Sequence, residues 1–269
     1  WTKKLRTQAA LLGGADLVIE LPLFAACSSA PDFAIGAVSL LHKLGVIDYL
    51  SFGSECQDIN KLKQIASFLI QYEEEIERGT KELMSLGHSY PKAKELYLRE
   101  HLDDASLIEV LKQPNNILGI EYLKALKKQN SRMVPYTLKR DSSGYHDTKL
   151  QPQSSSASAI RNALRHWEEQ PFSRYPADPQ QTPDGFSELL QNQLPENALR
   201  LLRDAWNQSC PIETNDFSLL LKYRLLCETR RSLCEYQDIS EDLANRIIRN
   251  RNQFLNFEQF CPAFKKQKN

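Results

Sequence analysis

Several short motifs that identify common enzyme classes are absent from the sequence. It contains no P-loop, no GxGxxG, no HExxH and no HxGH histidine pair, the element that grips a triphosphate in adenylyl-transferring Rossmann-like enzymes. The first three absences argue against P-loop hydrolases, dinucleotide-dependent oxidoreductases and HExxH metalloproteases. The six cysteines form no CxxC pair and no Cys/His cluster with zinc spacing, so no zinc site is expected.

The chain also lacks an excess of either charge and any long apolar run. Lys+Arg and Asp+Glu balance at 34 each, so RNA binding would need a local patch rather than a general positive field. No membrane-spanning segment is expected. The composition, 41% hydrophobic and 25% charged, is typical of globular proteins, and a length of 269 residues fits one large or two medium domains, of which we expect two. Reduced thiols and a cytoplasmic location are expected.

What is present in the first half is an alternation of strand and helix signals. Short apolar runs at residues 16–22 and 47–53 predict two buried strands, and helical spacing over 31–44, closed by Gly45, predicts a helix between them. This order indicates a parallel crossover unit. A third strand is predicted at 133–139.

The remaining pattern is helical. Helices are predicted at 60–86, 91–101, 106–129 with a break at Pro114, and 157–167. Leu5, Ala9 and Leu12 begin a helical pattern without a cap, so we expect a further segment upstream of Trp1.

A proline-rich polar stretch marks a domain boundary. Residues 169–184 have linker composition, which divides the chain into an α/β domain at 1–168 and an all-helical domain at 185–269. Two apolar stripes are predicted in the second domain, one from Phe217 to Leu226 and one from Leu243 to Phe257. Cys227 and Cys234, seven residues apart, are expected on one side of a helix as small core residues.

Ligands of open parallel sheets bind beyond the carboxyl ends of the strands, and two loops there carry unusual residues. In 51–55 (SFGSE), Gly53 allows a ligand to approach the backbone, and Glu55 suits a ribose hydroxyl or a metal; a simple strand-ending turn is the alternative. In the loop that starts at Arg140, the guanidinium suits phosphate. His146 beside Asp147 is a candidate general base or an ordinary solvated histidine.

Two helix starts carry further candidates. Residues 154–161 place hydroxyls, among them Ser156 and Ser158, on the first turn of a helix and Arg161 one turn in; this is either an anion site or plain N-capping. The adjacent Asn115 and Asn116 follow Pro114, and capping accounts for one asparagine more easily than for two.

The last candidate is a basic stretch at the C-terminal end. It suits RNA phosphates or forms a solvated helix face. Its cations are Arg246, Arg249, Arg251, Lys265, Lys266 and Lys268.

Taken together, five segments resemble the bacterial tRNA(Met) cytidine acetate ligase family in order and approximate spacing. The resemblance covers residues 1–167 strongly and continues more thinly through 223–225 and 240–246. The segments are 14–22 (GADLVIELP), 51–55 (SFGSE), 114–119 (PNNILG), 139–147 (KRDSSGYHD) and 156–161 (SASAIR).

The resemblance implies a Rossmann-like parallel-sheet nucleotidyltransferase core, whose first strand lies outside the chain, followed by an all-helical, tRNA-binding domain. It implies a ligase that joins acetate to AMP with ATP and passes the acetyl group to the N4 amine of the wobble cytidine of elongator tRNA(Met). Neither DNA nor a membrane is an expected partner. Mg²⁺ is expected with ATP from phosphate chemistry.

Carried over by position, the family's nucleotide contacts fall on Gly53, Asn115 or Asn116, and Arg140, with Asn115 favoured of the pair. The helix start at 156–161, with Ser156, Ser158 and Arg161, corresponds to a phosphate-binding Ser/Thr-Ile-Arg element. No catalytic residue is singled out.

Relatives begin with a strand and a Phe-His-Asn-Gly-His loop, which this sequence does not contain. They are also expected to continue past its last residue towards a basic stretch. Two alternatives therefore stay open: an adenylyltransferase acting on a small phosphorylated metabolite, and a non-catalytic nucleotide- or RNA-binding protein.

Overall fold

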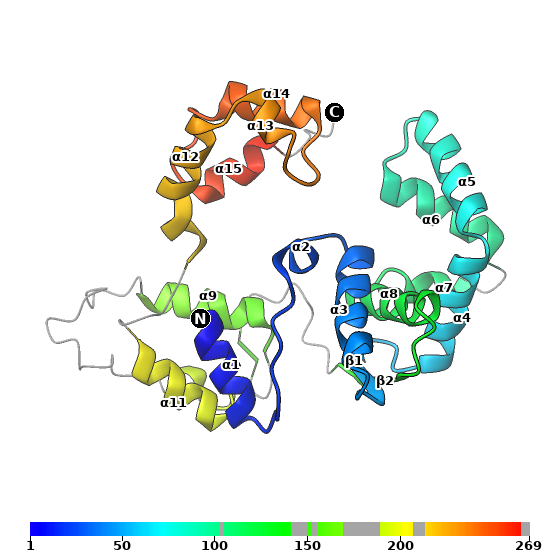
Figure 1. Cartoon of the computed structure of the whole chain (residues 1–269), viewed down its shortest axis with the longest axis horizontal. Coiled ribbons are helices and arrows are strands. Elements are labelled where there is room, and N and C mark those ends of the chain that lie inside the picture. The colour runs from blue at the N-terminus through cyan, green and yellow to red at the C-terminus, as the bar shows by residue number, and fades with distance from the viewer. Residues whose placement is uncertain (103–104, 141–149, 152–154, 169–188, 207–212, 265–269) are drawn as a thin grey trace, which may run out of the picture. The chain divides into compact units, whose positions relative to one another are not determined.

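The computed structural model describes residues 1–102, 105–140, 150–151, 155–168, 189–206 and 213–264 (Figure 1). The chain forms two compact units. One contains residues 19–163, and the other combines residues 1–18 with 164–269. The predicted linker at 169–184 lies outside the described residues, and the predicted domain boundary stays a prediction.

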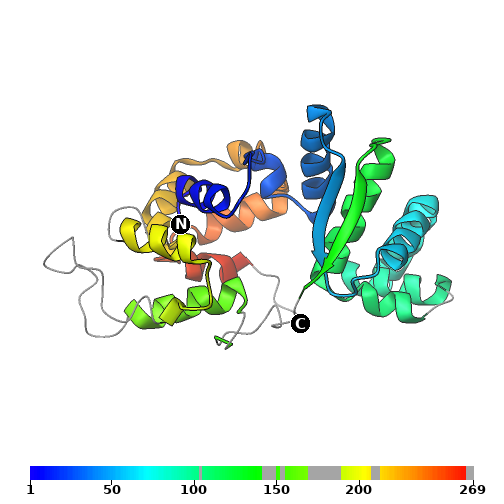
Figure 2. The same ribbon diagram turned by 90° about the horizontal axis from the view of Figure 1, so that it is seen from below.

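A parallel pair of strands forms the centre of the 19–163 unit. β1 (Tyr49–Ser54) pairs with β2 (Val134–Lys139) in the register Tyr49↔Val134 to Ser54↔Lys139, and Figure 2 shows the two strands side by side. The predicted strands at 47–53 and 133–139 are therefore confirmed. Parallel pairing brings the ends of both strands, and the loops that follow them, to one edge.

Helices cover the strands and supply most of the core. α8 (Pro114–Lys128) packs against α3 (Ala30–Leu44), α4 (Ile59–Gln71) and β1. Their buried faces follow helical spacing, and each deeply buried aliphatic side chain contributes roughly 1.5–3 kcal/mol of transfer free energy. Fully buried members of this core include Val38, Leu62, Ile65 and Ile120.

Two glycines have specific roles in these helices: one ends α3, and the other lets α8 pack closely against β1. Gly45 ends α3 in the left-handed conformation, with φ of 70°, which confirms the predicted C-cap. A Cβ on Gly119 of α8 would lie 2.5 Å from the ring of Phe52, so glycine at this position allows the β1 aromatic to rest on the helix.

Further helices follow α4. α5 (Glu73–Ser85) and α6 (Tyr90–His101) form an antiparallel pair, and α7 (Ala105–Val110) leads to α8. The single helix predicted at 60–86 is wrong, because Tyr72 ends α4 and begins α5 with φ of −110°. The pattern of charged residues continues across Tyr72. The periodicity of the sequence therefore does not reveal the break between the two helices.

The buried strand predicted at 16–22 is also wrong. The segment has no regular structure before α2 (Leu23–Ala26), and Leu17, Val18 and Ile19 are exposed. An apolar run becomes a strand only where a neighbouring strand accepts its ladder hydrogen bonds, and the described sheet consists of β1 and β2. The observed crossover therefore runs from β1 to β2 rather than from residues 16–22 to β1.

The other unit is built from helices. α1 (Lys3–Leu12) packs on α11 (Glu196–Ala205), and the Asn197 amide donates to the Leu12 carbonyl at 3.2 Å. The prediction that this first helix lacks a cap is wrong, since the Thr2 hydroxyl accepts from the Leu5 N–H. α9 (Ala157–Glu168) joins the two units in sequence.

The C-terminal helices enclose a small core of their own. Leu225, Leu233, Ala244, Ile247 and Phe254 form it. The regular elements described from Glu196 onward are all helical, as predicted, and no described helix of the chain is long and apolar enough to cross a membrane. These elements are α11, η1 (Thr214–Phe217), α12 (Ser218–Cys227), α13 (Arg230–Leu233), α14 (Glu241–Asn250) and α15 (Phe257–Phe264).

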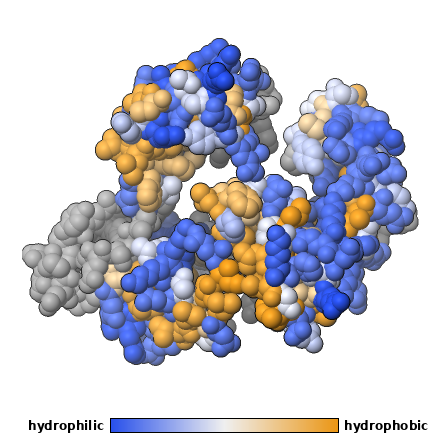
Figure 3. Space-filling model, viewed as in Figure 1, coloured by the Kyte–Doolittle hydropathy of each residue, from blue (hydrophilic) through white to orange (hydrophobic). Residues whose placement is uncertain are grey.

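Two expectations for these helices fail. Most of the predicted stripe from Phe217 to Leu226 is exposed, and Figure 3 shows an apolar surface over α12; the neighbouring Leu225 enters the core instead. Cys227 and Cys234 belong to different helix ends, because Glu228 and Thr229 interrupt the helix, and both thiols are exposed. The second stripe is confirmed by the burial of Ile247 and Phe254.

Candidate functional site at the carboxyl edge of the strands

The turn after β1 is fixed by a buried hydroxyl pair. Thr137 of β2 donates to the Ser54 hydroxyl at 2.7 Å, and Ser54 also accepts from the Gln57 N–H at 3.0 Å. Ser54 is fully buried, so these bonds satisfy a polar group that would otherwise cost free energy. The pair was not anticipated from the sequence; the polar residues Ser54 and Thr137 within otherwise apolar strands were its signal.

Glu55 joins this turn to the start of α8. Its two carboxylate oxygens accept the backbone N–H groups of Asn115 at 3.2 Å and Asn116 at 2.8 Å. It also accepts the side-chain amide of Asn115 at 2.6 Å. A carboxylate at a helix N-terminus satisfies free N–H groups and interacts favourably with the helix dipole.

Asn116 joins the start of α8 back to the turn after β1. Its side-chain oxygen accepts the N–H groups of Glu55 at 2.9 Å and Cys56 at 3.1 Å, and its amide nitrogen donates to the Val110 carbonyl at 3.1 Å. The side chain is 1% exposed. Asn116 therefore holds the loop and helix together, while Asn115 lies at the partly exposed edge.

Arg140 reaches the same edge from β2. Its backbone N–H extends the ladder to the Ser54 carbonyl at 3.0 Å, and its guanidinium donates to the Asn115 side-chain oxygen at 2.9 Å. A Cβ on Gly53 would lie 2.8 Å from Cγ of Arg140. The absence of a side chain at Gly53 thus leaves space for the Arg140 stem to cross β1.

These contacts define the edge cluster: Gly53, Glu55, Asn115, Asn116 and Arg140. The structure brings together all five residues, which the sequence placed in three separate segments. Arg140 presents an exposed cation, and the Asn115 amide is held between Glu55 and Arg140. Such an edge offers a fixed amide and a fork of N–H donors to a nucleotide.

The helix start at 156–161 shows local contacts. The Ser156 hydroxyl accepts the Ala159 N–H at 3.0 Å, as an N-cap does for α9, and Arg161 donates to the Ser158 hydroxyl at 3.2 Å. Capping is thus observed for Ser156. Ser158 and Arg161 hydrogen-bond to no described member of the edge cluster.

Other predicted candidates lie outside the described residues: Ser154 of the helix start, His146 and Asp147 of the loop after Arg140, and Lys265, Lys266 and Lys268 of the C-terminal basic stretch. In the part of the chain that the structure describes, no three His, Cys, Asp or Glu side chains gather into a metal site.

A parallel strand pair whose carboxyl edge carries a glycine, a fixed asparagine amide and an arginine is typical of α/β proteins that bind a ligand beyond the ends of their strands. A family model described as HIGH Nucleotidyl Transferase matches residues 1–268. The chain belongs to this family.

Curated relatives carry a more specific name. The chain is 37% identical to the tRNA(Met) cytidine acetate ligase of Alkaliphilus metalliredigens, with 98% of the chain and 61% of the relative covered. It is also 37% identical to the enzyme of that name from Caldanaerobacter subterraneus, with 91% and 56% covered. The chain thus spans about 60% of the length of these relatives. The predicted resemblance to the acetate ligases is confirmed.

Solved structures agree with the fold. Thermotoga maritima TmcAL in its apo form is 27% identical, with a TM-score of 0.83 over 99% of this chain and 60% of that one. The same protein bound with alpha-thio ATP gives 26% identity and a TM-score of 0.80, with 99% and 59% covered. The predicted nucleotidyltransferase-like fold is thereby confirmed.

Proposed function

We propose that the protein binds ATP at the edge cluster and acts in the acetylation of the wobble cytidine of tRNA(Met). The observation that carries the proposal is the Glu55–Asn115–Arg140 chain of hydrogen bonds, which holds an amide and a guanidinium at the nucleotide edge of a HIGH nucleotidyl transferase fold. The relatives' names and the ATP analogue bound to TmcAL support it.

The residue roles in this proposal follow from exposure and charge. Gly53, Asn115 and Arg140 contact the nucleotide, because they form the accessible part of the edge cluster. Asn116 supports them from the interior, since its amide is used in three hydrogen bonds within the protein. Ser156, Ser158 and Arg161 remain the proposed second phosphate contact, through the free N–H groups and dipole of the α9 start.

Activation of acetate by ATP would place additional negative charge on the α-phosphate in the transition state. A guanidinium already held by Asn115 needs little reorganisation to stabilise that charge. Positioning of the acetate oxygen in line with phosphorus would supply much of the remaining acceleration. Acetyl-adenylate and pyrophosphate are the products expected of this first step.

Mg²⁺ is proposed to accompany ATP. Both oxygens of Glu55, the acidic residue of the edge cluster, already accept N–H groups at the start of α8. We therefore propose that the ion is held chiefly by the phosphates and water, as Mg²⁺ is in many nucleotide sites. The same proposal places the protein in the cytoplasm, where its tRNA substrate is found.

The direct test is incubation of the protein with labelled acetate, ATP and tRNA(Met). Label on the tRNA, and its loss when Arg140 is replaced by Met, would support the proposal. Folded protein that transfers no label would overturn it. Pyrophosphate release that responds to a phosphorylated metabolite and not to acetate would indicate an adenylyltransferase instead.

A further inference from the structure

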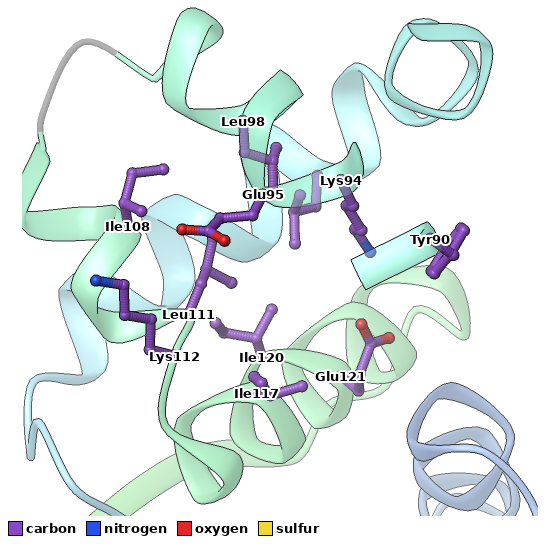
Figure 4. A pocket seen from close by; sticks show the side chains of 11 residues that line it. Tyr90, Lys94, Glu95, Leu98, Ile108, Leu111, Lys112, Ile117, Ile120 and Glu121 are labelled. Carbon is purple, nitrogen blue, oxygen red and sulfur yellow. The ribbon is translucent and has the colours of Figure 1, made fainter. Parts of the chain in front are cut away.

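A cavity of about 250 Å³ lies within the 19–163 unit. It opens between α6, α7 and α8, and Figure 4 shows the side chains that line it. Most of its wall is aliphatic, from Leu98, Ile108, Leu111, Ile117 and Ile120. The cavity shares no residue with the edge cluster.

Four charged residues also line this cavity, and three of them are paired. Glu121 forms an ion pair with Lys124 at 2.9 Å, in which both side chains are largely buried. Glu95 pairs with Arg99 at 2.8 Å and with Lys92 at 3.2 Å.

The third paired charge is Lys112, whose partner Glu109 lies outside the lining. These three side chains therefore have their charges compensated within the protein.

Lys94 is the exception. Its ammonium group makes no hydrogen bond or ion pair with any residue that the structure describes. Figure 4 shows the side chain extending from α6 into the space above α8.

Burial lowers the pKa of Lys94 below its ordinary value, and repulsion from Lys124 lowers it further, while Glu121 and Glu73 act in the opposite direction. Since burial is the largest of these effects, the charged form of Lys94 is destabilised, and a half-buried ammonium that hydrogen-bonds to no described residue is available to an anionic ligand.

We propose that this cavity is a binding site for a small organic anion, a carboxylate with a short aliphatic chain. The carboxylate would pair with the Lys94 ammonium, and the chain would fill the aliphatic wall. A charge-assisted hydrogen bond supplies orientation, and burial of each methylene adds affinity.

The dimensions and charges of the cavity restrict the ligand further. A volume of about 250 Å³ is below the usual 300–1,000 Å³ range for drug-sized ligands, so the ligand is small. A polyanion such as a nucleotide would meet the carboxylates of Glu95 and Glu121, whereas a single carboxylate meets Lys94. The proposal does not depend on the activity proposed above, because the two sites share no residue.

Hexanoate is the probe for this site. We expect calorimetric titration of the protein to show saturable binding of hexanoate and at least tenfold weaker binding of hexanamide, which has the same chain without the charge. Lys94→Met should weaken hexanoate binding at least tenfold. Lys94→Arg, which restores a cation, should recover most of the affinity.

Two control variants separate the cavity from other cationic surfaces. Lys112→Met removes a paired cation at the rim, and Arg140→Met removes the guanidinium of the edge cluster; both should leave the hexanoate dissociation constant within twofold. Thermal melting would establish that each variant is folded.

The proposal is overturned by absence of saturable binding, by equal affinity for hexanamide, or by full affinity in folded Lys94→Met. Loss of hexanoate binding in Arg140→Met would place the carboxylate at the edge cluster and would also overturn it. If Lys94→Met does not fold, Leu111→Phe provides the second variant, because it should fill the cavity and weaken binding while leaving the charge in place.

Discussion

Glu55 has a role that is set entirely by its neighbours. From the sequence alone, a glutamate at the end of a strand could bind a ribose hydroxyl or a metal, or could simply belong to a turn. In the structure its carboxylate accepts two backbone N–H groups and one amide from the first turn of α8. A partly buried network of this kind fixes the Asn115 side chain, which is the positioning role that the proposed ATP site needs from Glu55.

Glu55→Gln tests this positioning role. The substitution keeps the shape but turns one acceptor oxygen into a donor that faces N–H donors, which should cost about 1–3 kcal/mol. We expect a lower free energy of unfolding and weaker ATP binding, measured by denaturant unfolding and calorimetry. Glu100→Gln, an exposed site, is the matched control and should change neither quantity. Unchanged ATP affinity in Glu55→Gln would contradict a positioning role.

Two glycines provide a second test at the residue scale. Gly53→Ala would place a Cβ 2.8 Å from Arg140, and Gly119→Ala would place one 2.5 Å from Phe52. The first should displace the guanidinium and weaken ATP binding about tenfold, or roughly 1.4 kcal/mol, with little change in melting temperature.

Gly119→Ala should instead lower the melting temperature, because it disturbs the packing of β1 on α8 and does not displace the Arg140 guanidinium. Gly53→Ala should thus mainly weaken ATP binding, and Gly119→Ala should mainly lower stability. If Gly53→Ala bound ATP as well as the wild type, Arg140 would not depend on the open space over β1.

At the scale of elements, α6 carries a lysine, Lys94, whose charged form is disfavoured by burial in the folded state. The folded state lowers the pKa of Lys94, mainly by burial, so between that value and the ordinary 10.5 the unfolded chain binds more protons than the folded one. Stability contributed by this group therefore rises as the pH rises through the folded-state pKa, and the penalty is fully present below it.

Lys94→Met should accordingly be more stable than the wild type at pH 7. The difference in free energy of unfolding should narrow as the pH is raised towards 10.5, when the wild-type lysine loses its charge. Denaturant unfolding of both proteins over this range measures the effect, and subtraction removes the titration of groups that they share. A difference that stays constant with pH would show that only apolar packing has changed.

The elements differ in how well the sequence predicts them. β1, β2, α3 and α8 follow from apolar runs and end signals, because local patterning and tertiary packing agree there. Residues 16–22 have the same apolar pattern without a described ladder partner, and Tyr72 breaks a helix whose polar pattern is continuous. Both predictions failed because the structure of these segments depends on contacts with distant parts of the chain, which the local sequence pattern does not contain.

The edge cluster was predictable only in part. Its glycine, asparagines and arginine stand out by residue type and by resemblance, and parallel pairing brings them to one edge. The division of labour between Asn115 and Asn116 was not predictable in full, because it depends on which side chain faces the interior. In the structure Asn116 is buried in the loop–helix junction, whereas Asn115 is partly exposed.

At the scale of the whole molecule, the balance of 34 basic and 34 acidic residues means that tRNA binding would depend on a local patch. The predicted C-terminal basic set is one candidate, and its members have different roles. Arg249 is exposed, whereas Arg251 donates to the carbonyls of Leu225, Leu226 and Glu228 at the end of α12. Arg251 therefore stabilises the helical unit.

Arg249→Gln and Arg251→Gln should separate phosphate binding from folding. If the C-terminal set contacts RNA phosphates, Arg249→Gln should weaken tRNA binding and reduce its logarithmic salt slope by about 1. Arg251→Gln should mainly lower the melting temperature, since it leaves carbonyl groups unsatisfied. Filter binding over a salt series measures the first effect. A slope unchanged by Arg249→Gln would place the RNA contacts elsewhere.

The edge cluster is assembled from parts of the chain that are far apart in sequence. Asn116 meets Glu55 across 61 positions, and Thr137 meets Ser54 across 83. Such contacts close large loops, so their formation during folding carries a high entropic cost. If ATP binds at the edge cluster as proposed, a chain with its helices formed but its strands unpaired would not bind it, and ATP would selectively stabilise the completed fold.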